Sequence, residues 1–463
     1  MIEPRLNSND RIFPRIKNQI YDIYRLAIPI VLSRSGMMTL IVVDAAMVGH
    51  FSAVELGYQS IGLAPMMLII VTSIGLMSGT LVTTANYYGS KNFKKCGLVW
   101  RQSLVYAFFL GIIGILISSF GEEILIASGQ NKELSSGGGR IIQILGWSTP
   151  ALLIYIASSF FLEGIKRPNA TMLIMLLGNL TNIFLNWILV FGNFGFPTLG
   201  ATGSAYSTGA VRIVMAVSIV YYIWTLRDHI KFNIRGSNYL FLNGGWKKWS
   251  RMRRIGFGGG ASNAIESGAF SSMTIFAGLL GIIELGAFTL SFNMLALTFM
   301  FALGFGSATA VCVGNASGRS DILAIKIAGW TGLGLTILTL AFLGSLLALF
   351  NNQIASSFTQ DADLIVKTSS MIAFIGVVLV IDGGQSVMAH ALRGCGETWV
   401  PAALHCISYI LVMIPLGYYL SIISGRGILG LFESILIGSI LSLFLGSLRF
   451  TFLTKKGVNL KHN

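Results

Sequence analysis

Residues 41–57 read IVVDAAMVGHFSAVELG and place one acid, Asp44, inside an otherwise apolar segment that ends in a Glu-Leu-Gly turn. The same turn returns 229 residues later, at residues 284–286. Laying residues 47–90 on residues 276–319 without a gap also matches Gly49 with Gly278, Gly75 with Gly304, Ser78 with Ser307, Thr80 with Thr309, Asn86 with Asn315 and Gly89 with Gly318. The chain is therefore predicted to be a tandem duplication, with Asp44 in the first helix of the first copy.

The composition indicates a membrane protein. Of the 463 residues, 54% are hydrophobic and 11% are charged, and the mean hydropathy is +0.74, which does not describe a water-exposed surface. Crossing roughly 30 Å of hydrocarbon takes about 20 apolar residues in a helix, which satisfies its own backbone hydrogen bonds. The apolar runs are too long and continuous for the alternating strands of an outer-membrane barrel. We therefore expect an all-α integral membrane protein.

Twelve apolar segments reach spanning length, six in each half of the chain. Their approximate limits are 24–48, 57–86, 97–120, 141–163, 169–191, 201–225, 255–278, 286–313, 325–349, 368–391, 399–422 and 428–452. The predicted organisation is an N-terminal segment (1–23), a first lobe (24–226), a basic loop (227–254), a second lobe (255–452) and a C-terminal tail (453–463). An even number of spans per half gives both lobes the same orientation, related by an axis along the membrane normal, and predicts a central cleft.

The net charge of +14 comes from Lys and Arg that lie mainly in loops leaving the even-numbered spans. This is the positive-inside pattern, and it predicts that both termini are cytoplasmic. The basic residues do not gather with aromatic residues into one patch, so no nucleic-acid partner is expected. The sequence contains no H-E-x-x-H, P-loop or G-x-S-x-G motif, so neither an enzyme nor a bound cofactor is predicted.

Three acids lie well inside predicted spans, namely Asp44, Glu266 and Asp382. A charged side chain at the centre of the bilayer costs on the order of 3 kcal/mol or more, so it normally faces a cavity or a partner. An acid in such a cavity could exchange a proton for a cationic ligand. The alternative is that these acids pair with bases inside the membrane and hold helices together. The candidate bases are Arg34, Arg212, His390 and His405.

Polar neighbours at helical spacing surround two of these acids. Glu266 shares a face with Ser262 and Asn263, and Asp382 shares one with Gln385. In the fifth span, three amides run along one face, where they either hydrogen-bond between helices or line a cavity. They are Asn179, Asn182 and Asn186. Another acid, Glu163, lies beside Lys166 and Arg167 at the end of a span, and its position predicts an interfacial salt bridge with them.

Residues 26–51, LAIPIVLSRSGMMTLIVVDAAMVGHF, and the segment 61–89 after them resemble the opening of the multidrug and toxic compound extrusion (MATE) family. Glu266 and the run 381–385, IDGGQ, followed by LRG at 392–394, are similar to the NorM-like branch of that family. The resemblance covers essentially the whole chain. It implies twelve helices in two V-shaped lobes that export organic cations or drugs in exchange for Na+ or H+. We expect the protein to lie in a bacterial inner membrane and to function as a monomer.

Carried over to this sequence, the resemblance implies that Asp44 is the coupling acid of the first lobe, with Asn182 and Asn186 as its neighbours. Glu266 and Asp382 would form the cation site of the second lobe, where Na+ could bind. Two positions depart from the family pattern. Asn186 stands where the DinF-like branch usually has Asp, and Val378 stands where some relatives have a Tyr lining the ion site.

Two other functions remain as alternatives. A lipid-linked sugar flippase of the same superfamily would line its cavity with several bases to hold pyrophosphate, whereas this chain offers Arg34 and Arg212 against three acids. A membrane-embedded enzyme is disfavoured by the missing catalytic motifs. The sequence therefore predicts a secondary antiporter, and it does not separate Na+ from H+ as the coupling ion.

Overall fold

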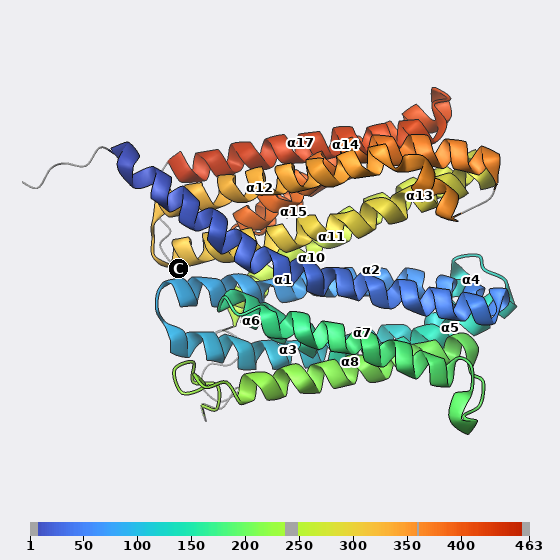
Figure 1. Ribbon diagram of the computed structural model, residues 1–463, viewed down its shortest axis with the longest axis horizontal. Helices are drawn as coiled ribbons and strands as arrows, with labels where there is room; N and C mark the ends of the chain where they lie inside the picture. The colour runs from blue at the N-terminus through green and yellow to red at the C-terminus, as the bar shows by residue number, and fades with distance from the viewer. Residues whose placement is uncertain (1–7, 237–248, 359–360, 456–463) are drawn as a thin grey trace, which may run out of the picture. The chain divides into compact units, whose positions relative to one another are not determined.

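The computed structural model describes residues 8–236, 249–358 and 361–455, and these residues form helices and loops without a strand. Figure 1 shows the long helices that dominate the chain. The elements are α1 (Ser8–Phe51), α2 (Ala53–Gly89), α3 (Phe93–Ser119), α4 (Gly121–Ala127), α5 (Lys132–Trp147), α6 (Thr149–Gly164), α7 (Asn169–Leu189), η1 (Asn193–Gly195), α8 (Gly200–Trp224), α10 (Ser250–Leu280), α11 (Ile282–Gly318), α12 (Ile322–Leu349), α13 (Asn351–Phe358), α14 (Ala362–Gly394), α15 (Trp399–His405), η2 (Cys406–Met413), α16 (Ile414–Tyr418), η3 (Tyr419–Ile423) and α17 (Gly427–Lys455). The predicted all-α class is confirmed.

Each of the twelve predicted spans falls on one helix or on consecutive helices, with ends that differ by at most two residues where the prediction overshoots. Within the described residues, ten helical segments are long and apolar enough to cross a membrane. The pair α5 and α6, bent by 47° at Ser148, passes the same criteria as one broken span. The seventh predicted span lies on α10, whose 31 residues begin with several arginines and are rich in glycine, so its mean hydropathy stays lower.

The helices group into two compact units. The first unit comprises residues 1–31, 88–90 and 261–463, and the second comprises residues 32–87 and 91–260. The division therefore falls inside α1, between Val31 and Leu32, and inside α10, between Gly260 and Ala261. Each unit consists mostly of one of the two sequence halves, with a helical segment contributed by the other half.

In the second unit, α2 and α5 pack closely because glycines face each other. A Cβ on Gly62 would lie 2.8 Å from the carbonyl oxygen of Gly138, so a larger residue would push the helices apart. Next to this contact lies an apolar cluster with residues from α1, α2, α4, α5 and α8. Its fully buried members include Val48, Met66 and Ile141.

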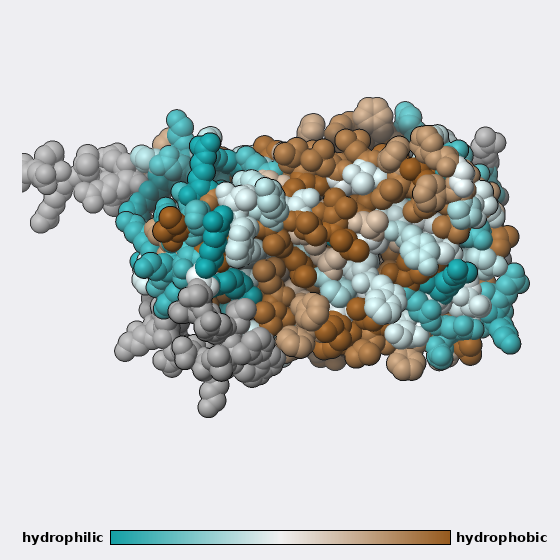
Figure 2. Space-filling view, turned by 90° about the horizontal axis from the view of Figure 1, so that it is seen from below, coloured by the Kyte–Doolittle hydropathy of each residue, from teal (hydrophilic) through white to brown (hydrophobic). Residues whose placement is uncertain are grey.

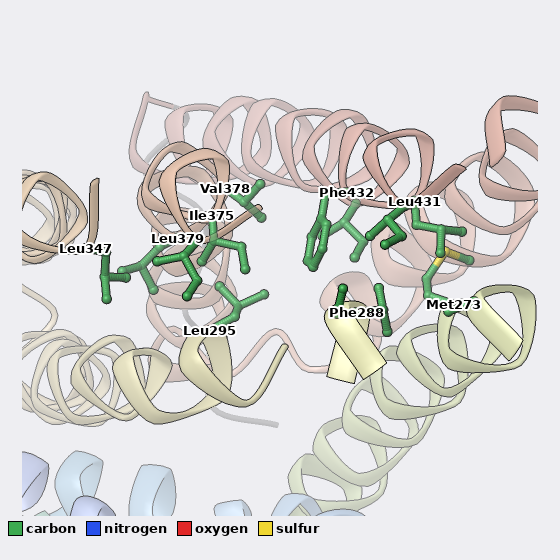
Figure 3. Close-up of a cluster of buried hydrophobic side chains, with 14 of the residues drawn as sticks. Met273, Phe288, Leu295, Leu347, Ile375, Val378, Leu379, Leu431 and Phe432 are labelled. Carbon is green, nitrogen blue, oxygen red and sulfur yellow. The ribbon is translucent and has the colours of Figure 1, made fainter. Parts of the chain in front are cut away.

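In the first unit, a larger apolar cluster joins α10, α11, α12, α14 and α17 (Figure 3). Phe288 stacks on Phe432 with ring centroids 5.1 Å apart. Val378 is fully buried in this cluster, and Figure 3 shows it beside Ile375. Position 378 is therefore part of the apolar core.

Apolar side chains cover the middle of the face in Figure 2, whereas hydrophilic side chains gather toward its ends. Single helices show the same property. On α12, Leu338 and Phe342 are 68% and 65% exposed, although both are large and hydrophobic. Such exposure is unfavourable in water and is expected where the neighbouring medium is lipid.

Candidate functional site

Asp44 on α1 is buried and receives two short hydrogen bonds in the second unit. Asn186 Nδ2 on α7 donates to Asp44 Oδ1 at 2.6 Å, and Thr208 Oγ1 on α8 donates to Asp44 Oδ2 at 2.5 Å. No lysine or arginine in the described part of the chain lies within salt-bridge distance of this carboxylate. A buried acid is therefore held by neutral donors.

Asn182 connects the two donors to each other. Asn186 Nδ2 also donates to Asn182 Oδ1 at 3.2 Å, and Asn182 Nδ2 lies 3.4 Å from Thr208 Oγ1. The structure thus brings together the three residues predicted for this site, Asp44, Asn182 and Asn186. Thr208 was missed, although Ser204, Thr208 and Arg212 follow one another at a spacing of four residues in the sixth span, which places three polar groups on one face.

The close packing of α7 against α1 depends on Gly36, which has no side chain. Asn179 Nδ2 donates to the carbonyl oxygen of Gly36 at 3.1 Å, and a Cβ on Gly36 would lie 2.6 Å from Met175 Cγ. Asn179 therefore hydrogen-bonds between helices, one of the two roles predicted for the asparagine stripe. Asp44 follows Gly36 on α1 as Asn186 follows Asn179 on α7, so the two helices run in the same direction.

The observed partners of Glu163 contradict one prediction from the sequence. Its Oε1 lies 3.2 Å from Arg34 Nη2 on α1, it accepts a hydrogen bond from Ser159 Oγ at 3.0 Å, and it is 1% exposed. The predicted interfacial bridge to Lys166 or Arg167 is wrong, since Arg167 instead pairs with Asp228. Proximity in sequence favoured the neighbouring bases, whereas helix packing brings in one that lies 129 residues away.

Asp382 on α14 is the buried acid of the first unit. Its Oδ1 accepts hydrogen bonds from Ser439 Oγ on α17 at 2.8 Å, from Gln385 Nε2 at 3.3 Å and from Tyr409 OH at 3.4 Å. The acid is 2% exposed, and all three donors are neutral. Both units therefore bury an aspartate among neutral donors, although the two aspartates do not occupy equivalent positions of the duplicated sequence.

Gln385 joins Asp382 to Glu266 on α10. The same Nε2 that donates to Asp382 also donates to Glu266 Oε1 at 3.2 Å. Glu266 is less enclosed than Asp382, since its side chain is 20% exposed. The three predicted residues Glu266, Asp382 and Gln385 thus form one cluster in which an amide bridges two carboxyl groups.

Three further side chains extend this cluster, namely His405 at the end of α15, Ser262 on α10 and Arg393 on α14. His405 Nε2 is 3.2 Å from Gln385 Oε1, and His405 Nδ1 is 3.0 Å from Ser262 Oγ on α10 and 3.9 Å from Glu266 Oε2. Arg393 Nη2 on α14 donates to Ser262 Oγ at 2.8 Å and to Asn263 Oδ1 at 3.4 Å. The predicted Asn263 therefore lies at the edge of the site, in contact with Arg393.

The local chain explains how His405 and Tyr409 reach α14. Pro415 has no N–H group, so a regular helix through it would leave a carbonyl group unpaired. The chain instead becomes π-helical from Cys406 to Met413, immediately after His405 and around Tyr409. Wider helical turns of this kind are frequent at functional sites. Neither residue stood out by spacing, although a histidine inside an apolar span is itself a signal.

Transition-metal chemistry has no support in the described part of the chain. No group of three or more His, Cys, Asp or Glu side chains there could hold a metal ion. The groups around Glu266 and Asp382 are instead carboxylate, amide and hydroxyl oxygens, which are hard ligands suited to cations such as Na+ or to a proton.

Comparison with known proteins identifies the family. The model of the MatE family matches the chain twice, at residues 29–188 and 260–419, which agrees with the duplication read from the sequence. A probable multidrug resistance protein NorM of Caulobacter vibrioides is 34% identical over 92% of this chain and 90% of its own length. A probable multidrug resistance protein NorM of Xylella fastidiosa is 27% identical over the same shares.

The fold agrees with solved structures. The crystal structure of the eukaryotic MATE transporter AtDTX14 matches with a TM-score of 0.87 at 19% sequence identity, covering 96% of this chain and 99% of that one. The resemblance to the MATE family and its NorM-like branch is confirmed. The chain therefore belongs to the MatE family and is a multi-pass membrane transporter, not an enzyme.

Proposed function

We propose that this chain is a multidrug efflux antiporter of the bacterial inner membrane, with both termini in the cytoplasm. It exports cationic amphiphilic compounds in exchange for Na+ or H+ and works by alternating access as a monomer. The bacterial NorM relatives, which are named as probable multidrug resistance proteins, support the export of drugs.

The observation that carries the exchange mechanism is the burial of acids without direct Lys or Arg partners. Asp44 and Asp382 accept hydrogen bonds from Asn, Thr, Ser, Tyr and Gln side chains, none of which carries a positive charge. A buried anion without a counter-charge is costly, so each acid favours a state in which it binds a cation. A proton, a sodium ion and an organic cation can each fill this role, but not at the same time. Mutually exclusive occupancy is the requirement for exchange.

The driving force is sufficient for efflux. Each net positive charge that moves inward per cycle through 100 mV releases about 2.3 kcal/mol, which corresponds to a concentration ratio of about 50. Net charge moves inward only when the entering ions carry more positive charge than the exported cation carries out. A gradient of Na+ or of pH adds to this value. The cation that enters would neutralise Asp44, Glu266 or Asp382 and so release the exported compound.

The test is ethidium efflux from proteoliposomes under a pH gradient alone and then under a Na+ gradient alone. Asp44→Asn, Glu266→Gln and Asp382→Asn are measured beside the unaltered protein. Each exchange of an essential acid for its amide should lower the rate at least about tenfold, because the amide can neither release a proton nor bind a cation as a carboxylate does. Glu397→Gln is the matched control, since Glu397 pairs with Arg449 outside both sites.

Transport driven by Na+ and lost in the Glu266 and Asp382 variants would place coupling in the second half of the sequence. Transport driven by pH and lost in Asp44→Asn would place it in the first half. Export at the unaltered rate by all three variants would show that the proposed mechanism is wrong.

A further inference from the structure

The Gln385 amide occupies the space between the two carboxyl groups of the first unit. Its Nε2 lies 3.2 Å from Glu266 Oε1 and 3.3 Å from Asp382 Oδ1, so its two hydrogens point to one oxygen of each acid. A cation that binds both of these oxygens would meet the same two hydrogens. The amide and the cation therefore compete for one place.

The donor and acceptor roles along the hydrogen-bond chain follow from this amide orientation. With Nε2 toward the acids, Gln385 Oε1 faces His405 Nε2 at 3.2 Å, so that ring nitrogen must carry a hydrogen. His405 Nδ1 is then an acceptor, and the hydroxyl group of Ser262 donates to it at 3.0 Å. Arg393 donates to the same hydroxyl oxygen at 2.8 Å, which leaves the hydroxyl hydrogen free to point at the ring.

Ser262 offers His405 a second arrangement. Its backbone carbonyl oxygen also lies within reach of His405 Nδ1, at 3.3 Å. If the ring hydrogen sits on Nδ1, that carbonyl accepts it, and Nε2 becomes an acceptor. The Gln385 amide must then turn by 180°, so that its NH₂ group faces the ring and its oxygen faces the two acids. His405 keeps a hydrogen bond at both nitrogens in either arrangement.

We propose that the Gln385 amide is a placeholder for the coupling Na+, and that His405 lets the amide turn by exchanging its Nε2 hydrogen for one on Nδ1. The proton that leaves Nε2 goes to solvent, and Nδ1 takes one from solvent by way of Glu266, whose partly exposed carboxylate lies 3.9 Å from it, so the charge of the ring does not change. The proposal rests on the proposed function, since it assumes that Glu266 and Asp382 bind the coupling ion. It adds that Gln385 is a ligand in one orientation and a substitute cation in the other.

The occupancy of the acids decides between the two arrangements. Without Na+ between them, two carboxylate oxygens favour the NH₂ group and repel the amide oxygen. With Na+ present, the amide oxygen is a good ligand, whereas the NH₂ hydrogens are repelled by the positive charge. The hydroxyl group of Ser442, 3.4 Å from Gln385 Oε1, can donate in the first arrangement and accept in the second. The ring proton of His405 therefore reports whether Na+ is bound.

The decisive measurement is nitrogen NMR of histidine-labelled full-length protein in nanodiscs at fixed pH. Spectra are recorded with Na+ and with an equal concentration of an organic cation too large for the site, and His405→Gln assigns the signal of His405. We expect the hydrogen on Nε2 without Na+ and on Nδ1 at saturating Na+. A His405 hydrogen that stays on one nitrogen under both conditions would overturn the proposal.

A variant changes the balance between the two arrangements. Ser262→Ala removes the hydroxyl donor but keeps the backbone carbonyl, so it weakens only the Nε2–H arrangement. The Na+ concentration that half-saturates the NMR shift should fall about fivefold, the effect of one ordinary hydrogen bond. Ser271→Ala is the matched control, because the Ser271 hydroxyl group is exposed on the same helix and bonds only within it. A midpoint that rises or does not change in Ser262→Ala would contradict the proposal.

The transport assay separates the two levels of failure. If Glu266→Gln and Asp382→Asn export ethidium at the unaltered rate, coupling at this pair is wrong and the placeholder proposal falls with it. If both variants lose transport while the His405 hydrogen does not respond to Na+, the proposed function stands and only the placeholder is wrong.

Discussion

The two halves of the chain treat one repeated position in opposite ways. In the first half, Arg34 on α1 forms a direct ion pair with Glu163 on α6 at 3.2 Å. In the second half, the equivalent residues are Asn263 on α10 and Arg393 on α14, and Arg393 donates to the neutral side chains of Asn263 and Ser262.

The difference separates structure from function. A charge that is neutralised by its neighbour fixes two helices and does nothing further, which fits Arg34 and Glu163. The charge on Arg393 is not neutralised at that position. Its hydrogen bond to Ser262 connects it through His405 to the amide that lies between Glu266 and Asp382. The duplicated positions therefore carry an ion pair in one half and, in the other half, an arginine that contacts the candidate site.

The largest expected effect comes from breaking the buried ion pair between Arg34 and Glu163. Glu163→Gln leaves the buried Arg34 without a counter-charge and should lower the free energy of unfolding by about 3–5 kcal/mol, because an unpaired buried charge is strongly unfavourable. The melting temperature of the purified protein, followed by tryptophan fluorescence, measures the loss. Replacing both partners, with Arg34→Met and Glu163→Met, should restore most of the stability. A double variant as unstable as the single one would show that the pair is not merely structural.

A second substitution would give Arg393 a direct ion pair like the one between Arg34 and Glu163. Asn263→Asp gives Arg393 a direct carboxylate partner and draws its guanidinium group away from Ser262. Stability should be kept, whereas ethidium efflux should fall about tenfold as the contact to the His405 chain weakens. Asn263→Ser is the matched control that adds no charge. Efflux at the unaltered rate in Asn263→Asp would show that Arg393 does not act on the site.

A smaller effect is expected at Asp44. Thr208→Val keeps the shape of the side chain but removes the hydrogen bond of 2.5 Å to the carboxylate. The unsatisfied oxygen should bind the coupling cation more tightly, so the half-saturating concentration of that cation in efflux should fall about fivefold. Thr208→Ser keeps the hydroxyl group and should behave as the unaltered protein. Equal behaviour of the Val and Ser variants would exclude a role for this hydrogen bond.

The smallest effect is expected at an exposed pair. Arg449 donates to both carboxylate oxygens of Glu397, and the two side chains are 45% and 23% exposed. Glu397→Gln should cost less than about 1 kcal/mol of unfolding free energy, because water and salt screen such pairs. Melting curves at low and high salt test this value. A loss as large as that of Glu163→Gln would remove the distinction between buried and exposed pairs.

The sequence predicted most of the fold because long apolar runs indicate membrane helices and because repeated glycines indicate the two halves. It also singled out Asp44, Glu266 and Asp382, which stand out against an apolar background and which the structure places among polar partners. It failed where partners come from distant helices. Nothing local to Glu163 points to Arg34, and nothing local to Asp382 points to Tyr409 and Ser439, because these contacts depend on how helices pack. Thr208 and His405 were visible as polar residues in apolar spans, but not as members of a particular site.

Two hydrogen bonds between α1 and α7 hold these helices in register. One is the hydrogen bond from Asn179 to Gly36, and the other is that from Asn186 to Asp44. They lie about 12 Å apart along α1, since eight residues rise 1.5 Å each. Because the two hydrogen bonds are separated along the helix, they restrict both sliding and rotation of α1 against α7. The carboxylate of Asp44 is therefore aligned by a glycine two turns away, and Gly36→Ala would misalign a site that it does not touch.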